Sequence, residues 1–338
     1  NVRTRAHLLE VAGHVVPVTV NWREYDNSFV CSPYSTFVRY LYDELALINN
    51  PWLVGFLRTL TSAGALALKA GQIDRVIQVN NWLISTNLYP ELPDEFVGSA
   101  TDFLKTEYPG HAVVFRSLTR ATNANLMNSL MRKGYIMIPS RQIYLFEGAD
   151  GHFMKKRMTR SDLALIRKTP YQFVGHDDIG PRDYERMARL YGMLYLEKHS
   201  FLNPQFTPNY IRKCHRDRAL TFCGFRDRDG ELQAVIGLFE RENVMATHFI
   251  GYNTQLPVEH GLYRMLMGKL LESAAERKCL LNLSSGAAHF KTLRGGRPAI
   301  EYTAVYAKHL SHLRQSLFRT MAAVAERVAV PLMKAYKL

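Results

Sequence analysis

The second half of the chain is divided into blocks with strand spacing and blocks with helix spacing of apolar residues. Apolar runs predict strands over 220–226, 232–241 and 244–253, and Asp227-Arg228-Asp229-Gly230 between the first two is a tight-turn sequence. The pattern then predicts a helix over 261–277, a strand over 279–283, a short helix over 287–293 and a strand over 299–306. Residues 181–199 and 208–215 have helical spacing, and 311–335 form a basic amphipathic helix interrupted near Pro331. This half therefore reads as a strand meander followed by helix, strand, helix and strand.

The first half shows a less regular alternation of predicted strands and helices. Strands are predicted over 14–20, 111–118 and 135–146, with a β-rich run over 75–87. Helices are predicted over 35–48, over 52–68, from Asp94 to just before Pro109, and over 123–133, where Gly134 closes the helix. The stretch 148–160, which contains Lys155-Lys156-Arg157, is interpreted as a domain junction.

The length of 338 residues favours two domains over a single core. We predict an α/β chain of the α+β type, with a mixed sheet flanked by helices, divided into residues 1–150, 151–310 and a C-terminal helix at 311–338. A hydrophobic content of 47% and a charged content of 22% are ordinary for a globular protein. No apolar stretch reaches the length of a membrane span, and no signal peptide is recognisable at the start. These features predict a cytoplasmic protein.

Four cysteines are scattered at positions 31, 214, 223 and 279, without CxxC pairs or zinc-ligand spacing. We interpret them as reduced, structural thiols and expect no metal. The charge is more informative, because residues 1–150 hold 13 basic and 13 acidic side chains, whereas the rest holds 30 and 17. The whole net charge of +13 thus falls in the second half, which favours anionic partners such as coenzyme A phosphates, an acidic acyl carrier protein or tRNA.

A motif near the end of the second half suggests a family. The segment 281–296 reads LNLSSGAAHFKTLRGG, with Phe290-Lys291 on a short helix and Gly295-Gly296 before the last strand. It resembles the end of the second domain in Fem-type peptidoglycan aminoacyltransferases and CelD-like acyltransferases. Both groups belong to the GNAT superfamily, whose core has the element order predicted above. The resemblance implies two tandem GNAT-like domains, a degenerate one at 1–150 and a catalytic one at 151–310, that move an acyl group to an amine.

Three features depart from these families. Arg294 stands where Fem-type sequences usually have an aromatic residue, no long helical hairpin interrupts the second half, and the Arg/Gln-x-x-Gly-x-Gly/Ala phosphate loop of ordinary GNAT enzymes is absent. The resemblance therefore leaves two donors open, acyl-CoA and aminoacyl-tRNA. Either one acts as a co-substrate, and no tightly bound cofactor is expected.

The helix predicted to begin at Gly261 is the expected donor site, because helix N-termini favour anions. Gly261 permits close backbone approach and Arg264 offers a phosphate contact, while Glu259 opposes an anion. The same segment contains His260, Leu262 and Tyr263. Lys291 and Arg294 lie three residues apart on the short helix, and the resemblance implies that Lys291 holds the donor or stabilises charge on the transferred carbonyl, with Arg294, Gly295 and Gly296 beside it.

Acyl transfer to an amine requires a base and an acid. Glu240, His248 and Tyr252 are the candidates on the central strands, and a spacing of two predicts that His248 and Tyr252 share a face. The candidates for contacts with substrate are Glu197, Lys198, His199, Asn203, Ser284, Ser285, Tyr302 and Tyr306. Each of these residues also has a purely structural interpretation, as a core histidine, a packing tyrosine or a polar helix end.

The sequence thus supports three hypotheses. The first is an N-acyltransferase, an acetyltransferase-like enzyme that moves an acyl group from a CoA or carrier-protein thioester to an amine or amino-acid-like acceptor by direct attack. The second is a Fem-type aminoacyl transferase that uses aminoacyl-tRNA. The third is an inactive GNAT-like module that binds RNA or a protein partner, motivated by the basic cluster Arg212, Lys213, Arg216 and Arg218.

Overall fold

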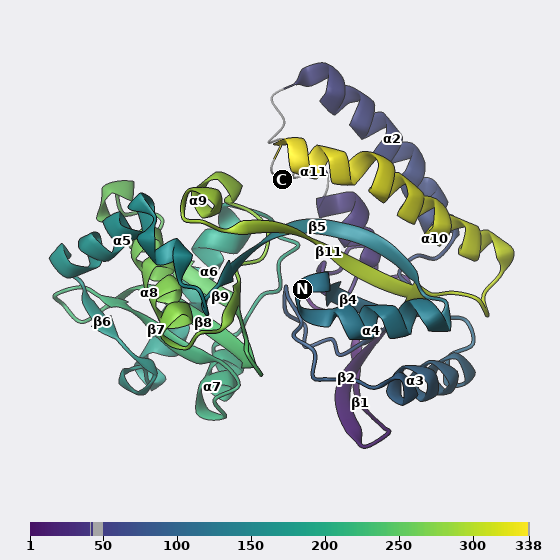
Figure 1. The fold of residues 1–338 in the computed structure, drawn as a ribbon, viewed down its shortest axis with the longest axis horizontal. Coiled ribbons are helices and arrows are strands. Elements are labelled where there is room, and N and C mark those ends of the chain that lie inside the picture. The colour runs from purple at the N-terminus through teal and green to yellow at the C-terminus, as the bar shows by residue number, and fades with distance from the viewer. Residues whose placement is uncertain (41, 43–49, 337–338) are drawn as a thin grey trace. The chain divides into compact units, whose positions relative to one another are not determined.

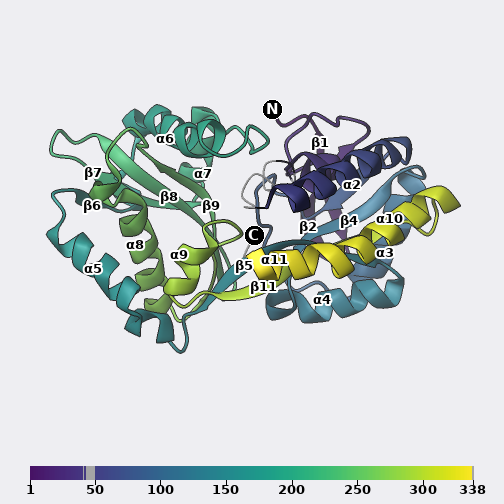
Figure 2. The same cartoon turned by 90° about the horizontal axis from the view of Figure 1, so that it is seen from above.

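The computed structural model describes residues 1–40, 42 and 50–336. The chain divides into two compact units, Asn1–Gln142 with Ala299–Leu338, and Ile143–Pro298. Both divisions fall inside strands, namely β5 (Ile136–Glu147) and β11 (Arg297–Tyr306). Each unit is described below by itself (Figures 1 and 2).

The first unit is a mixed sheet with helices on both faces (Figure 1). Its strands follow the order β1 (Arg5–Val11), β2 (His14–Asn21), β3 (Val76–Val79), β4 (Ala112–Leu118), β11 and β5. Strands β3 and β4 run parallel, whereas the pairs β1–β2, β2–β3 and β4–β11 are antiparallel. One core lies under α3 (Asp94–Glu107) and α4 (Arg120–Lys133), and a second lies under α2 (Pro51–Ala70) and α10 (His312–Val324).

The chain end packs onto this unit. Helix α10 continues through η7 (Ala325–Ala329) into α11 (Val330–Tyr336). The predicted interruption near Pro331 is present as the π-helical segment η7, just before the proline. Phe318 is 3% exposed and belongs to the second core of the unit, so this helix is part of the fold.

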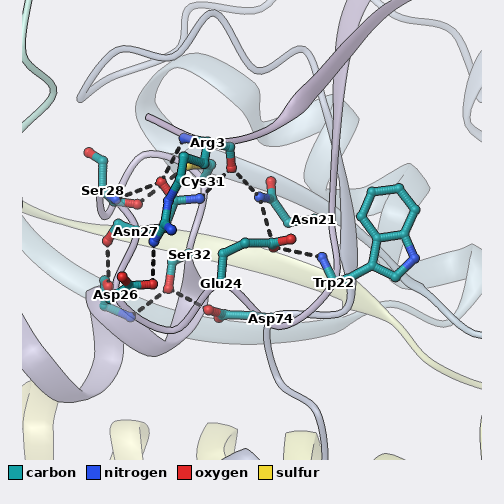
Figure 3. Close-up of polar contacts among 11 residues, drawn as sticks. Arg3, Asn21, Trp22, Glu24, Asp26, Asn27, Ser28, Cys31, Ser32 and Asp74 are labelled. Carbon is teal, nitrogen blue, oxygen red and sulfur yellow. Dashed lines mark hydrogen bonds and ion pairs between the residues drawn. The ribbon is translucent and has the colours of Figure 1, made fainter. Parts of the chain in front are cut away.

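Polar side chains organise the segment between β2 and η1 (Ser35–Arg39) in the first unit (Figure 3). The carboxylate of Asp74, which is 1% exposed, accepts hydrogen bonds from Ser32 Oγ at 2.6 Å and from the Tyr34 amide at 2.7 Å. Burial raises the pKa of Asp74 to about 7. Glu24 accepts from the Trp22 amide at 2.8 Å and so closes the turn after β2. A pocket lies beside this turn, lined by Trp22, Arg23, Glu24 and Arg75.

The second unit is a sheet covered by two layers of helices (Figure 2). Its strands follow the order β5, β10 (Leu280–Asn282), β9 (Val244–Tyr252), β8 (Leu232–Arg241), β7 (Thr221–Arg226) and β6 (Gln172–Val174). The meander β6–β9 is antiparallel, and β10 pairs parallel with β9 and antiparallel with β5. The helices α5 (Arg157–Lys168) and α8 (Leu262–Glu276) cover one face. The segments α6 (Tyr184–Tyr191), η5 (Gly192–Glu197) and α7 (Pro208–Arg216) cover the other, and α9 (Ala288–Leu293) follows β10.

Most predicted elements are confirmed, including the α+β class, the Asp227–Gly230 turn and the closure of α4 by Gly134, which has φ +97°. Two interpretations were wrong. The junction assigned to 148–160 contains η2 (His152–Lys155) and the start of α5. The strand expected over 75–87 ends at Val79. Strand β1 was not predicted. The helix expected over 35–48 begins with η1, which is π-helical. Positions 41 and 43–49 of this expected helix lie outside the described residues.

The early end of β3 has a local cause. The side chain of Asn87 accepts a hydrogen bond from the Trp82 amide, and that of Asn81 accepts from the Leu83 amide. Asparagines that bind nearby backbone in this way compete with a strand ladder. The segment after Val79 is therefore a polar loop.

The two compact units differ from the predicted division at both boundaries. Residues 143–150, which we assigned to the first domain, lie in the second unit. Residues 299–310, which we assigned to the catalytic domain, and the helix at 311–338 both lie in the first unit. Charge is therefore shared more evenly than the halves of the sequence suggested, since the second unit holds 24 basic and 17 acidic side chains and the first holds 19 and 13. No helix in the described part of the chain is long and apolar enough to cross a membrane.

Candidate functional site

Two neighbouring strands of the second unit separate after a short contact. Strand β10 pairs with β9 only at Leu280–Asn282 against Val244–Ala246, while β9 continues to Tyr252. Within the described chain, no strand pairs with residues 247–252 of β9 on the β10 side. Backbone N–H and C=O groups at such an edge are strong hydrogen-bonding groups that seek a partner. This open edge of β9 can therefore hold an extended ligand with amide groups.

His248 lies at a β-bulge on this edge. Leu238 pairs with Thr247 and Gly237 pairs with Phe249, so His248 is the extra residue between them. A bulge bends the strand and redirects a side chain, and bulges are common beside active sites. The imidazole is 5% exposed.

The bulge changes the expected placement of His248 and Tyr252. The His248 ring lies 5.4 Å from the ring of Phe239, which packs on the core under α6. The Tyr252 ring lies 6.0 Å from the ring of Tyr263 on α8, which belongs to the opposite core. The alternation used for the sequence prediction assumed a regular strand. The two side chains therefore pack against different clusters instead of sharing one face.

Glu240 is distant in register from the open edge. It pairs with Met245, at the end of β9 that β10 also joins. Its carboxylate forms an ion pair with Arg277 Nη1 at 2.5 Å. This ion pair occupies the carboxylate with a cation at the end of α8. The structure therefore brings His248, rather than Glu240, to the edge that β10 leaves open.

Lys291 is buried at 3% exposure, and its ammonium group is used by the fold. Its Nζ donates to the carbonyl oxygens of Leu283 at 2.7 Å, Ser284 at 3.2 Å and Ser285 at 2.8 Å. An ammonium group has three N–H donors, so these bonds account for all of them. Lys291 thus fixes the backbone that leaves β10 toward α9. The predicted contact with an acyl donor would require it to exchange one of these carbonyls.

The backbone between β10 and α9 has an unusual conformation. Ser284, Gly286 and Ala287 have φ values of +56°, +77° and +48°. The Ser284 amide donates to Asn282 Oδ1 at 2.8 Å, and the Ser284 carbonyl accepts from the Tyr144 amide at 3.2 Å. Side chains tolerate positive φ only where surrounding contacts enforce it. Here the Lys291 ammonium and β5 supply those contacts. Ser284 and Ser285 therefore contribute backbone atoms to this turn.

Asp162 on α5 is the centre of a buried charge cluster that sequence analysis missed. Its carboxylate, in a side chain that is 0% exposed, accepts from Arg294 Nε at 2.5 Å and Nη2 at 3.0 Å, and from Arg264 Nε at 2.7 Å. The Arg294 guanidinium also lies 3.3 Å from the ring centroid of Phe290. The cluster joins α5, α8 and α9. Arg264, which we predicted as a phosphate contact, and Arg294, which we predicted beside Lys291 at the donor site, therefore both bind this carboxylate.

The start of α8 is covered by α5. Gly261 has φ +68°, and a Cβ there would lie 2.4 Å from Leu165 Cδ2. His260 Nδ1 and the Tyr171 hydroxyl are hydrogen-bonded, Glu259 is exposed, and Leu262 is in the core. Burial raises the pKa of Tyr263. Gly261 is thus needed for its backbone conformation and for contact with Leu165.

The glycine pair also has a packing explanation. Gly295 has φ +91°, and a Cβ there would lie 3.2 Å from the Cβ of Phe153. A Cβ on Gly296 would lie 2.8 Å from Phe146 Cζ. Both glycines therefore let the end of α9 approach two phenylalanines that are in edge-to-face contact at 5.6 Å.

The remaining substrate candidates fall in two places. Glu197, Lys198 and His199 are exposed at the end of η5, where partial burial and then the Lys198 charge lower the pKa of His199. Asn203 is buried, and its Nδ2 donates to the Ser200 carbonyl at 2.9 Å, which shapes the turn. Tyr302 and Tyr306 are on β11 in the first unit, where Tyr306 packs against Tyr135 at 5.3 Å. The two tyrosines thus belong to a different unit from Lys291.

Comparisons with known proteins agree with the geometry of the second unit. Residues 154–292 match the family model described as an acetyltransferase (GNAT) domain. The second unit is therefore a GNAT domain, and the resemblance inferred from the motif is confirmed. No curated protein matches the sequence.

Solved structures show the same fold at low identity. L-PGS from Bacillus licheniformis is 15% identical over 68% of this chain and 78% of its own, with a TM-score of 0.50. The C-terminal domain of a putative lysylphosphatidylglycerol synthetase from Agrobacterium fabrum is 14% identical over 69% and 78%, also at 0.50. FemX is 10% identical over 69% and 85%, with a TM-score of 0.49. The first two similarities show a shared fold, and the chain covers 78% of the length of each of these two structures.

Proposed function

We propose that the second unit transfers an acyl group from a coenzyme A or carrier-protein thioester to an amine on a small, amino-acid-like acceptor. The observation that supports this most is the separation of β10 from β9 after Ala246, within a GNAT domain. The pantetheine arm of a thioester donor carries two amides in an extended chain. It can add to the open edge of β9 as a strand adds to a sheet.

The proposed reaction is direct attack. The amine nitrogen bonds to the thioester carbonyl carbon, the C–S bond breaks, and the proton lost by the amine finally neutralises the thiolate. We assign His248 as the residue that accepts the proton, because it lies at the bulge on the open segment of β9, and the resulting imidazolium as the group that returns the proton to sulfur. Tyr252 packs against the opposite cluster and has no part in this assignment. General acid–base groups of this kind contribute roughly 10²- to 10⁴-fold to a rate.

Lys291 acts in this proposal as a positioning residue. It orients the carbonyls of residues 283–285, and through them the chain that borders the opening on the β10 side. Its charge remains close to that backbone. Asp162, Arg264 and Arg294 hold α9 in place and have no direct role in the chemistry.

A second candidate uses an aminoacyl ester of tRNA as the donor. The two neighbours that share the fold at a TM-score of 0.50 include a putative lysylphosphatidylglycerol synthetase, and both units of this chain carry more basic than acidic side chains. The transfer step is the same except that the leaving group is the ribose hydroxyl. Such a donor binds largely through phosphate contacts, which makes its affinity fall steeply with salt.

Ligand-induced thermal stabilisation separates these candidates. The protein is heated with acetyl-CoA, a long-chain acyl-CoA, deacylated tRNA or buffer, each at low and high salt. A donor at 100 times its Kd stabilises the folded state by about 2.7 kcal/mol. A shift with either CoA ester supports the thioester proposal, whereas a salt-sensitive shift with tRNA alone replaces it. Binding without turnover of any amine would identify an inactive module.

A further inference from the structure

The first unit holds a partly buried arginine whose guanidinium group has no carboxylate partner among the described residues. Arg116 is on β4, and burial, followed by the charge of Arg141, lowers the pKa of its guanidinium to about 10. Within the described residues, Arg116 donates only to Val30 and Asn81, and neither is charged. Placing a cation in such surroundings costs free energy unless an anion compensates it.

One edge of the Arg116 guanidinium is fixed by the fold. Nη1 donates to the Val30 carbonyl at 2.8 Å and to Asn81 Oδ1 at 3.3 Å. Asn81 is itself held, because its Nδ2 donates to Thr19 Oγ1 at 2.8 Å. The Tyr89 hydroxyl donates to the Arg116 carbonyl at 2.6 Å. The orientation of the guanidinium is therefore set before any ligand arrives.

The other edge is open. Nε and Nη2 of Arg116 donate to no atom of the described protein, and neither is among the buried atoms without a partner, so both reach solvent. These two nitrogens point their N–H bonds in parallel, which matches the two oxygens of a carboxylate. The same protein uses this edge in Arg294, whose Nε and Nη2 bind Asp162 at 2.5 and 3.0 Å.

The local charge selects a monoanion. Arg141 Nε and Nη2 bind Glu301 at 2.7 and 3.1 Å, and Glu301 is 3% exposed. Both residues act electrostatically on Arg116. Two guanidinium groups with one carboxylate leave a single positive charge. A carboxylate would neutralise it, whereas a phosphate dianion would leave a negative charge in a region of low dielectric constant, which is costly.

We propose that the first unit contains a recognition site for the carboxylate of a small ligand, in which the Nε and Nη2 groups of Arg116 bind the two carboxylate oxygens. The site is separate from the GNAT chemistry of the second unit and requires no acyl donor. Its failure in an experiment is therefore distinguishable from failure of the proposed transfer reaction.

The first test uses the wild-type protein and arginine labelling with phenylglyoxal, read at individual peptides by mass spectrometry. Sodium acetate is compared with sodium chloride at equal ionic strength. We expect acetate to slow labelling of Arg116 about fivefold when present at four times its Kd, and to leave the exposed Arg120 unchanged. Equal rates at Arg116 in the two salts would overturn the site. Stronger protection by inorganic phosphate than by acetate would overturn the choice of a monocarboxylate.

The second test uses a matched pair of variants. Arg116→Lys keeps the positive charge but removes the paired Nε and Nη2 donors that bind a carboxylate. Arg120→Lys makes the same change on the surface of the same unit. Acetate should raise the Tm of the wild type and of Arg120→Lys by about 2 °C and that of Arg116→Lys by less than half as much. A full shift in Arg116→Lys would show that acetate binds elsewhere and would refute the proposal. Should Arg116→Lys not fold, the labelling of the wild type decides.

Discussion

Asp162 and Arg294 are 132 positions apart in the sequence and form a two-pronged ion pair inside the GNAT domain, with Arg294 Nε 2.5 Å from Oδ2 and Nη2 3.0 Å from Oδ1. The side chains are 0% and 3% exposed. A buried ion pair of this kind is weak evidence for net stability, but removal of one partner leaves the other charge buried without a counter-charge. The pair therefore makes the position of α9 dependent on α5.

The first prediction concerns Asp162→Asn. The variant leaves two guanidinium groups around a neutral amide, and we expect the second unit to lose about 3–5 kcal/mol of stability. Hydrogen exchange of peptides from α8 and α9 measures this loss directly. It is the suitable probe because all tryptophans, Trp22, Trp52 and Trp82, are in the first unit.

Asp229→Asn is the control for this change, since Asp229 is exposed in the β7–β8 turn. The opening free energies from hydrogen exchange in that variant should match those of the wild type within about 0.5 kcal/mol, which is roughly the effect of a surface substitution on stability. Wild-type protection of α9 in Asp162→Asn would mean that the cluster does not hold that helix.

The second prediction concerns Lys291→Met. Methionine fills a similar volume but donates no hydrogen bond, so three carbonyls lose their buried donor, and we expect a loss of about 2–4 kcal/mol. Exchange should rise first in residues 283–287. Lys168→Met, at the exposed end of α5, should change neither exchange nor turnover. Lost turnover with unchanged exchange in Lys291→Met would instead favour direct contact with the donor, as the family resemblance implied.

The third prediction is a pH dependence of the first unit. Burial raises the pKa of the Asp74 carboxyl from its ordinary value of 3.8 to about 7 in the folded state. The folded state thus holds a proton that the unfolded state has lost. The stability that Asp74 contributes is complete below about pH 4 and is lost as the pH rises through about 7, a change of roughly 4 kcal/mol.

Asp74→Asn isolates this contribution, because an amide can accept from Tyr34 and donate to Ser32 without titrating (Figure 3). Urea unfolding followed by tryptophan fluorescence reports the first unit. The difference in unfolding free energy between wild type and variant should move by roughly 4 kcal/mol in favour of the variant between pH 4 and pH 8. A constant difference across this range would contradict the raised pKa.

The fourth prediction tests the assignment of the base. If His248 accepts the proton, His248→Ala should lower kcat by about 10²-fold or more while leaving the thermal shift with the acyl donor intact. Glu240→Gln removes only a carboxylate held by Arg277 and should lower kcat by less than about threefold, a typical surface effect. If Glu240→Gln lowered kcat more than His248→Ala does, Glu240 rather than His248 would be the residue that accepts the proton.

Local sequence patterns determined most of the elements. The Asp-Gly turn between β7 and β8, the helical spacing of α8 and Gly134 at the end of α4 are signals within a few residues, and each was predicted correctly. The motif around Phe290-Lys291 also identified the GNAT domain. The edge strand β1 was missed because most of its side chains are exposed, so its hydrophobic pattern is weak.

Contacts between distant residues decided the site. The sequence marked Lys291, Arg264 and Arg294 as important cations, but only the tertiary structure shows that three carbonyls and Asp162 already satisfy them. A hydrophobic pattern also cannot reveal the bulge at His248, since the extra residue is defined by its pairing with β8. Local spacing fixes which residues form an element, whereas burial and hydrogen-bond partners are properties of the packed chain. For that reason the sequence identified the fold and its charged residues, and the structure determined what each of them binds.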